Sequence, residues 1–212
     1  MTVAVEIVFE THSLTTDNEA GVATGWLDGQ LSARGRALAT ELGRRRRNDA
    51  VAAVFASDLG RTVETVELAF GGSDVPVYLD ARLRECDYGA WNGMPVARLA
   101  RERAQRLSRP FPDGESYLQV VARVASFLEE LVCDWDGTRV LVVGHSATRW
   151  ALDHLLAGAA LHDLVAAPFD WREGWSYELP QGRGRGARPG PGRAAPSRRS
   201  TRPAGARRRP ES

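Results

Sequence analysis

The sequence contains no lysine, and it has few cysteines and histidines. All 28 basic residues are arginines, and two cysteines and four histidines occur among 212 residues. Cys86 and Cys133 lie far apart, and neither has a second Cys or a His at metal-ligand spacing. This pattern argues against a disulfide framework and against a zinc site. We expect two free thiols and no metal.

Long apolar runs are also absent. No apolar stretch reaches the roughly 20 residues of a membrane helix, and the N-terminus lacks the basic-then-apolar layout of a signal peptide. We therefore expect a cytoplasmic protein without a membrane partner. Its 212 residues suit one domain of ordinary size.

Charge is divided unevenly along the chain. Residues 182–212 carry ten Arg against one Glu, a net charge of +9, whereas residues 1–181 carry 18 Arg against 26 acids, a net charge of −8. The basic segment has no Leu, Ile, Val, Met or aromatic residue, so it cannot bury enough apolar surface to offset the entropy of ordering. We expect a folded domain at residues 1–180 and a disordered Arg-, Gly-, Pro- and Ala-rich tail at residues 181–212.

Two interpretations of this tail stay open. It is either an arm that touches nucleic acid or an acidic surface non-specifically, or an appendage without function. Nucleic acid is otherwise not an expected partner of this chain.

Strand-like and helix-like segments alternate through residues 1–180, which is typical of an α/β domain with a mostly parallel sheet. The expected strands are Val3–Phe9, Ala52–Ala56, Val75–Leu79, Arg139–Val143 and Ser176–Leu179. The expected helices are Ser32–Arg47, with Ser32 as its N-cap, Gly60–Phe70, Val96–Leu107, Ser116–Trp135 and Ala147–Ala157.

Three polar residues stand near the ends of these segments. His12 follows the first strand, at the sheet edge where α/β proteins bind ligands. Arg61 opens a helix, where a guanidinium and free backbone N–H groups suit a phosphate. Glu85 lies in a Gly-broken loop and can act as general acid or base, with Asp87 as an equal candidate. Any one of them alone would ordinarily be a solvated side chain.

The segment RVLVVGHSATRW joins an apolar strand to a helix through His145 and Ser146. It nearly fits the nucleophile elbow G-x-S-x-G, which would make Ser146 the nucleophile of an esterase. Only His154 and His162 follow it, and both are expected on a helix face or in a loop. The esterase hypothesis is therefore the weakest one.

A second interpretation pairs His145 with His12. If their two strands are central neighbours, both histidines meet Arg61 and Glu85 in one small volume. This set suits phosphoryl transfer, because an imidazole attacks phosphorus, cations stabilise the charge, and a carboxylic acid protonates the leaving oxygen. That chemistry requires no metal ion.

Six segments in order resemble the histidine phosphatase superfamily, which includes phosphoglycerate mutases. They fall within residues 3–180 and read ETHSLTTDN, TGWLDGQLSARGRALA, SDLGRTVET, LRECDYGAWNG, PDGES and VVGHS. The resemblance implies a three-layer α/β/α sandwich with a mostly parallel central sheet, and it implies no cofactor.

The resemblance also implies roles for single residues. His12 is then the nucleophile that becomes phosphohistidine, Arg61 and His145 bind the phosphoryl group, and Glu85 is the proton donor and later the base. Asn18 hydrogen-bonds the transferring group or the substrate. The function implied is a metal-independent phosphomonoesterase acting on a small phosphorylated metabolite.

The sequence departs from the family pattern beside the nucleophile. Thr11 stands where the family has Arg, and Ser13 stands where it has Gly. A hydroxyl cannot reproduce a bidentate guanidinium, so we expect a loss of about 2–4 kcal/mol in transition-state stabilisation unless another cation enters. Candidate cations are Arg149, Arg82 and Arg84.

Ser146 replaces a further family glycine, and its hydroxyl either donates to the phosphate or caps the helix. Three alternatives to the phosphatase stay open: a mutase, a weakened homologue that binds a phosphorylated ligand or a partner, and the Ser146 esterase. The sequence predicts neither the particular substrate nor the oligomeric state.

Overall fold

A computed structural model describes residues 3–180, and the tail expected at residues 181–212 lies outside the described residues. The main sheet has the strand order β4-β3-β6-β1-β7. Its strands are β1 (Val3–Thr11), β3 (Ala53–Ala56), β4 (Val77–Leu79), β6 (Thr138–Gly144) and β7 (Trp175–Pro180). All pairs are parallel except β1 with β7, so the mostly parallel sheet is confirmed.

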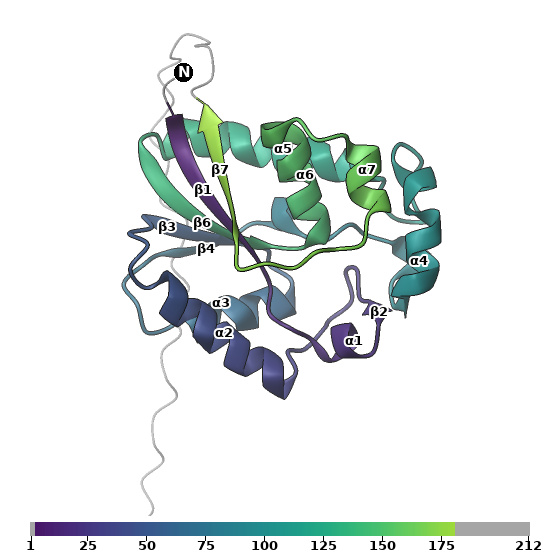
Figure 1. The fold of residues 1–212 in the computed structure, drawn as a ribbon, viewed down its shortest axis with the longest axis horizontal. Coiled ribbons are helices and arrows are strands. Elements are labelled where there is room, and N and C mark those ends of the chain that lie inside the picture. The colour runs from purple at the N-terminus through teal and green to yellow at the C-terminus, as the bar shows by residue number, and fades with distance from the viewer. Residues whose placement is uncertain (1–2, 181–212) are drawn as a thin grey trace, which may run out of the picture. The chain divides into compact units, whose positions relative to one another are not determined.

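Helices cover both faces of this sheet. Figure 1 shows α2 (Ala33–Arg46) and α3 (Gly60–Phe70) on one face, and α5 (Tyr117–Asp134) and α6 (Ser146–Ala157) on the other. The short helix α7 (Leu161–Ala166) contacts α6. The predicted three-layer α/β/α sandwich is thus confirmed, and the Ser32 side chain caps α2 by accepting from the Gly35 N–H.

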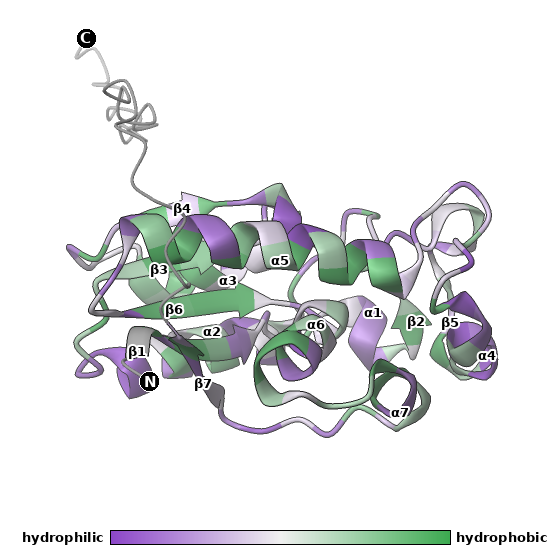
Figure 2. Cartoon of the chain, turned by 90° about the horizontal axis from the view of Figure 1, so that it is seen from above, coloured by the Kyte–Doolittle hydropathy of each residue, from purple (hydrophilic) through white to green (hydrophobic). Residues whose placement is uncertain are grey.

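The core explains why β6 is central. Val140 and Val142 join the cluster under α5 and α6, whereas Leu141 and Val143 join the cluster under α2 and α3. Side chains alternate along a strand, so a strand buried on both faces must be apolar at successive positions. Figure 2 shows β6 in hydrophobic colours along most of its length.

The pairing of β1 with β6 places the two histidines together. The strands run parallel in a register that ends with Thr11 opposite Gly144. One residue further, the His12 N–H donates to the Gly144 carbonyl at 2.9 Å. The two strands are neighbours, as the sequence analysis requires for His12 and His145 to meet.

Several elements differ from the sequence expectation. The helix expected at Val96–Leu107 is α4 (Val96–Glu102) followed by a tighter 3₁₀ turn (Arg103–Arg106), a common way for a helix to end. Short elements were not expected at all: α1 (Thr16–Glu19), α7, and the paired strands β2 (Val22–Ala23) and β5 (Met94–Pro95). Two-residue strands are too short to produce a hydrophobic period. α1, β2 and α4 lie together at the right of Figure 1.

A buried ion cluster fixes the end of β1. Glu10 is 1% exposed, and its Oε1 accepts from Arg46 Nη2 at 2.6 Å and from Arg45 Nη2 at 3.1 Å. Arg46 also donates to the Glu173 carbonyl, just before β7. The cluster therefore ties β1, two residues before His12, to the end of α2 and to the segment preceding β7.

Replacing Arg46 should destabilise the fold more than replacing an exposed arginine of the same helix. Arg46→Met leaves the buried Glu10 carboxylate with Arg45 as its remaining ion-pair partner, and we expect a loss of about 2–3 kcal/mol in unfolding free energy. Arg44, which pairs with Glu41 at the surface, is the control, and Arg44→Met should cost under about 0.5 kcal/mol. Urea denaturation measures both; equal losses would contradict a special role for Arg46.

Candidate active site

A cavity of about 100 Å³ lies at the C-terminal ends of β1 and β6. Five residues proposed from the sequence line it: His12, Asn18, Arg61, Glu85 and Ser146. Four others do not belong to its lining: Thr11, Ser13, His145 and Arg149. The wall opposite the strands comes from β2, the loop after it and the start of α4.

His12 is held in one tautomer by the backbone. Its Nδ1 lies 2.7 Å from the Ser13 carbonyl oxygen. A carbonyl can only accept, so Nδ1 carries the proton and Nε2 keeps its lone pair. Burial, and then the Arg61 cation, lower the pKa of His12 from 6.5 to about 3. The imidazole is therefore neutral, with an unprotonated Nε2, at neutral pH.

His145 lies beside His12, with 5.0 Å between the ring centroids, and is 1% exposed. Arg61 Nη2 stands 3.3 Å from His145 Nδ1. Because a guanidinium can only donate, Nδ1 is the acceptor and the proton belongs on Nε2, which donates to Ser57 Oγ at 2.9 Å. Burial and the Arg61 cation hold the pKa of His145 well below its usual range. Both ring nitrogens are engaged, so in this geometry His145 orients Arg61.

Arg61 opens α3 and is 2% exposed. Its Nη2 donates to the Gly25 carbonyl at 2.8 Å, and its Nη1 donates to the Leu27 carbonyl at 3.3 Å. With the His145 contact, these bonds leave the Nε–H and one Nη1–H without an acceptor in the described part of the chain. Arg61 can thus offer two N–H groups to an anion.

Glu85 is buried, and one of its oxygens is already bonded. Its Oε1 accepts from the Cys86 N–H at 2.7 Å and from the Ala147 N–H at 3.3 Å. Burial raises the pKa of Glu85 above its ordinary 4.5. With Oε1 bonded to two donors, Oε2 is the oxygen that would carry the proton. Asp87 lies outside the cavity lining, and its carboxylate accepts from the Asn92 amide instead.

Asn18 contributes donors to the cavity through its position in α1. Its Oδ1 accepts from the Thr15 N–H at 3.1 Å, which completes a capping box. The amide N–H groups of Asn18 are therefore the part of its side chain that remains for a ligand.

The Ser146 hydroxyl does not cap α6. The cap residue of that helix is His145, and it makes no side-chain capping bond. Within residues 3–180, no hydrogen bond joins Ser146 to a histidine, because His154 contacts the Ala159 carbonyl and His162 contacts Asp163. No Ser-His-acid triad is formed around Ser146 there.

Ser13 is turned toward the helices. Its hydroxyl donates to the Gly35 carbonyl at 2.6 Å, and its N–H donates to Thr65 Oγ1 at 3.0 Å. Any side chain at position 35 would clash with the Leu14 carbonyl, so glycine allows this close approach of the loop to α2. Ser13 thus anchors the loop that carries His12.

Two of the arginines considered as replacements for the missing cation are occupied elsewhere. Arg82 forms an ion pair with Asp80 at 2.5 Å. Arg84 binds Asp58 through two bonds of 2.6 and 2.7 Å. Neither arginine lines the cavity.

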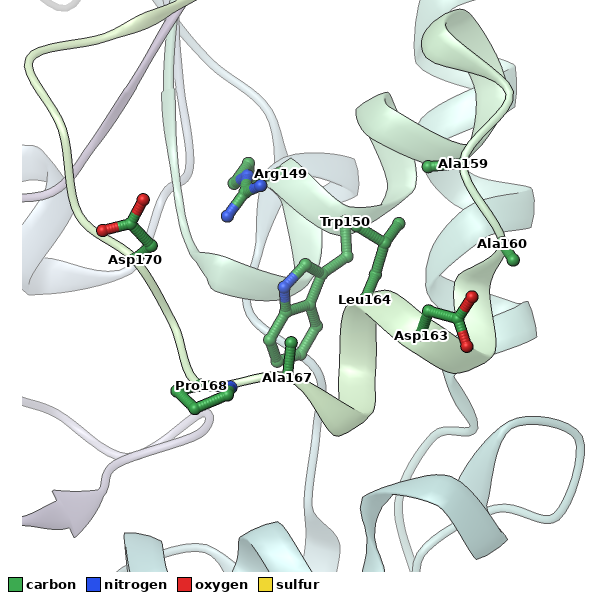
Figure 3. A pocket seen from close by; sticks show the side chains of 9 residues that line it. All are labelled: Arg149, Trp150, Ala159, Ala160, Asp163, Leu164, Ala167, Pro168 and Asp170. Atoms are coloured by element: carbon green, nitrogen blue, oxygen red, sulfur yellow. The ribbon is translucent and has the colours of Figure 1, made fainter.

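The third, Arg149, belongs to a different cavity. It forms an ion pair with Asp153 one turn along α6, at 2.8 Å, and its guanidinium lies 5.0 Å from the Trp175 ring centroid. Figure 3 shows Arg149 beside Trp150 in this second cavity, which has a volume of about 340 Å³ and is also lined by Asp170. The local acid explains why Arg149 is directed away from His12.

Sequence reasoning missed Arg103. This residue begins the 3₁₀ turn after α4, and it lines the cavity together with His12 and Glu85. In the sequence Arg103 lies within the helix expected at Val96–Leu107, and that prediction does not indicate what its side chain faces.

The structure also bears on metals, membranes and thiols. Nowhere in residues 3–180 do three His, Cys, Asp or Glu side chains gather so that they could hold a metal ion. No helix in that range is long and apolar enough to cross a membrane. Cys86 and Cys133 are free thiols, as expected.

The chain is similar in sequence to proteins of one known family. The family model of the histidine phosphatase superfamily (branch 1) matches residues 7–172. The chain is 30% identical to phosphoserine phosphatase 1 of Hydrogenobacter thermophilus over 166 residues, covering 74% of this chain and 78% of that protein. It is 28% identical to the probable phosphoglycerate mutase GpmB of Salmonella arizonae over 162 residues, covering 73% and 75%.

A solved structure has a similar fold. YhfR of Bacillus stearothermophilus superposes with a TM-score of 0.70 and 27% sequence identity, covering 80% of this chain and 88% of that one. The family match extends over most of the described residues, from the middle of β1 to the segment before β7. The chain therefore belongs to the histidine phosphatase superfamily.

Proposed function

We propose that this chain is a metal-independent phosphomonoesterase that hydrolyses a small phosphorylated metabolite through a phosphohistidine at His12. The observation that carries the proposal is the 2.7 Å contact between His12 Nδ1 and the Ser13 carbonyl, because it leaves Nε2 unprotonated. His12 shares its cavity with Glu85, a buried carboxyl group with a raised pKa. The relative named as a phosphoserine phosphatase supports the same chemistry.

In the first half-reaction the His12 Nε2 lone pair attacks phosphorus. The bond between phosphorus and the ester oxygen breaks, and its electron pair stays on that oxygen, which takes the proton of Glu85. The products are an alcohol, phosphohistidine and the Glu85 carboxylate. Arg61 and the Asn18 amide stabilise the charge on the other phosphoryl oxygens.

In the second half-reaction water attacks phosphorus, and the Glu85 carboxylate takes a proton from it. The bond between phosphorus and Nε2 breaks, its electron pair returns to His12, and orthophosphate leaves. A mutase would differ in the acceptor, since a hydroxyl group of a second phosphorylated molecule would replace water. The mutase-named relative makes this the second candidate function.

Replacing the nucleophile should abolish turnover. We expect His12→Ala to lower the release of orthophosphate from phosphomonoesters by about 10⁴-fold or more, because the imidazole that attacks phosphorus is removed. Ser146→Ala should cost about tenfold or less, the loss of one neutral donor. Phosphate release is measured with a chelator present, and acid-labile label on His12 is sought after quenching.

Three other results would each support a different function. Activity that survives His12→Ala but is lost in Ser146→Ala would establish the esterase alternative. Transfer of label to a second phosphorylated metabolite, with little orthophosphate, would identify a mutase. A chain that binds phosphoesters without turning any over would be a binding homologue.

The loss of activity caused by Glu85→Gln should depend on the leaving group of the substrate. An alkyl alkoxide needs a proton as it departs, so we expect a loss of about 10²–10⁴-fold with an alkyl phosphate and a smaller loss with p-nitrophenyl phosphate, which leaves as a stable anion. Without the base, the phosphoenzyme should accumulate and give a burst of nitrophenol in rapid-mixing kinetics. Equal losses for both esters, without a burst, would remove Glu85 from the proton-transfer role.

The dependence of kcat/KM on pH should reflect both shifted groups. His12 must be unprotonated, and its pKa of about 3 keeps it so well below 6.5, so histidine protonation should remove no activity near pH 6. Glu85 must be protonated, so activity should fall as pH rises through its raised pKa. Activity should therefore be highest at pH values below that raised pKa. The test is to measure kcat/KM against pH and to correct it for ionisation of the substrate phosphate. A fall in the corrected kcat/KM as pH drops through 6.5 would contradict the lowered pKa of His12.

A further inference from the structure

A bound phosphoryl group would need a second cation beside Arg61, and Thr11 does not supply one. Thr11 stands where the family resemblance places an arginine, and it does not line the cavity. Arg61 lines the cavity, but three of its N–H groups are directed to Gly25, Leu27 and His145. A phosphoryl dianion held by Arg61 alone would be under-compensated in a buried site.

Arg103 lines the same cavity and is otherwise unoccupied. Its Nε is buried without a partner, and across residues 3–180 no hydrogen bond or ion pair engages its guanidinium. Among the described residues its guanidinium lies against the face of Trp150, with 5.2 Å from the guanidinium carbon to the ring centroid. The stacking fixes the plane of the guanidinium and leaves its N–H edges for a ligand.

Two other arginines, Arg106 and Arg123, each have an acceptor in the described chain. Arg106 in the same turn donates to the Pro110 carbonyl at 3.0 Å, and Arg123 forms an ion pair with Glu115 at 2.9 Å. A half-buried guanidinium without acceptors costs free energy unless a ligand supplies them. An anion in the cavity would supply them to Arg103.

Arg103 is also near the general acid. Its charge, like that of Arg61, favours the ionised form of Glu85 and so opposes the effect of burial on the pKa of that carboxyl group. Both arginines line the same cavity as Glu85. Negative charge that builds up on the phosphoryl oxygens during transfer would lie among these groups.

We propose that Arg103 is the second guanidinium that holds the transferring phosphoryl group, in place of the arginine that Thr11 has replaced. The inference rests on the proposed function and adds a substrate-contacting residue to it. The clamp then comes from the turn after α4 instead of from β1.

Three variants test the proposal: Arg103→Gln, Arg103→Lys and, as the control, Arg101→Gln. Arg101 is exposed, lies in the same helical segment and does not line the cavity. We expect Arg103→Gln to lower kcat/KM by about 100-fold. The loss should be equal for the phosphate ester of an uncharged alcohol and for that of a hydroxycarboxylic acid. The kcat/KM of Arg103→Lys should lie between those of Arg103→Gln and the parent chain, because lysine keeps the charge but cannot form two parallel hydrogen bonds. Arg101→Gln should match the parent chain.

Binding of inorganic phosphate, measured by calorimetry, gives a readout without turnover. We expect Arg103→Gln to weaken it by about tenfold or more, since one bidentate partner of the anion is lost. Unchanged phosphate affinity would overturn the proposal. So would a kinetic loss confined to the carboxylate-bearing ester, which would place Arg103 against the leaving group instead.

The two proposals can fail separately. If the parent chain hydrolyses no ester, the phosphatase assignment fails, whereas the phosphate titration still decides whether Arg103 holds the anion. If Arg103→Gln does not give the circular dichroism spectrum of the parent, Arg103→Lys serves in the same titration. Full phosphate affinity in that charged but forkless variant would contradict a bidentate contact.

Discussion

The parallel pairing of β1 with β6 is the constraint on which the site depends. Parallel strands end at the same edge of a sheet, and the register that matches Thr11 with Gly144 brings His12 and His145 to that edge with their rings 5.0 Å apart. The pairing is possible because both strands bury apolar side chains in the middle of the sheet. Arg61 and Glu85 then need only short connections from their own elements to reach the same cavity.

Burial at this edge reverses the order in which two groups release their protons. In water a glutamic acid, near 4.5, loses its proton before an imidazolium, near 6.5. In the folded chain burial lowers the pKa of His12 to about 3 and raises that of Glu85. Desolvation disfavours the charged form of each group, so the same cause is the largest one in lowering the pKa of His12 and in raising that of Glu85. These two shifts are the ones that the proposed phosphoryl transfer requires of His12 and Glu85.

The sequence predicts those parts of the site that lie at the ends of regular elements. His12, Arg61 and His145 each follow a strand or open a helix, so hydrophobic periodicity indicates where they meet. Arg103 could not be found this way, because the apolar pattern of its segment continues past the point where the helix becomes a 3₁₀ turn. The sequence also did not predict the ion pairs of the three arginines considered as replacement cations. These arginines bind acids of their own: Arg149 binds Asp153, Arg82 binds Asp80, and Arg84 binds Asp58.

The two departures beside the nucleophile differ in their physical consequence. His12 needs only a carbonyl oxygen from position 13, and every residue provides one, so Ser13 can replace glycine and use its hydroxyl to bind Gly35. The family residue at position 11 is instead required for its side chain, which Thr11 cannot imitate. In the proposed mechanism position 13 acts through its backbone and can be serine, whereas the charge that is absent at position 11 must come from another element. Besides Arg61 of α3, the cavity lining in the described part of the chain contains Arg103, and the proposal assigns this charge to it.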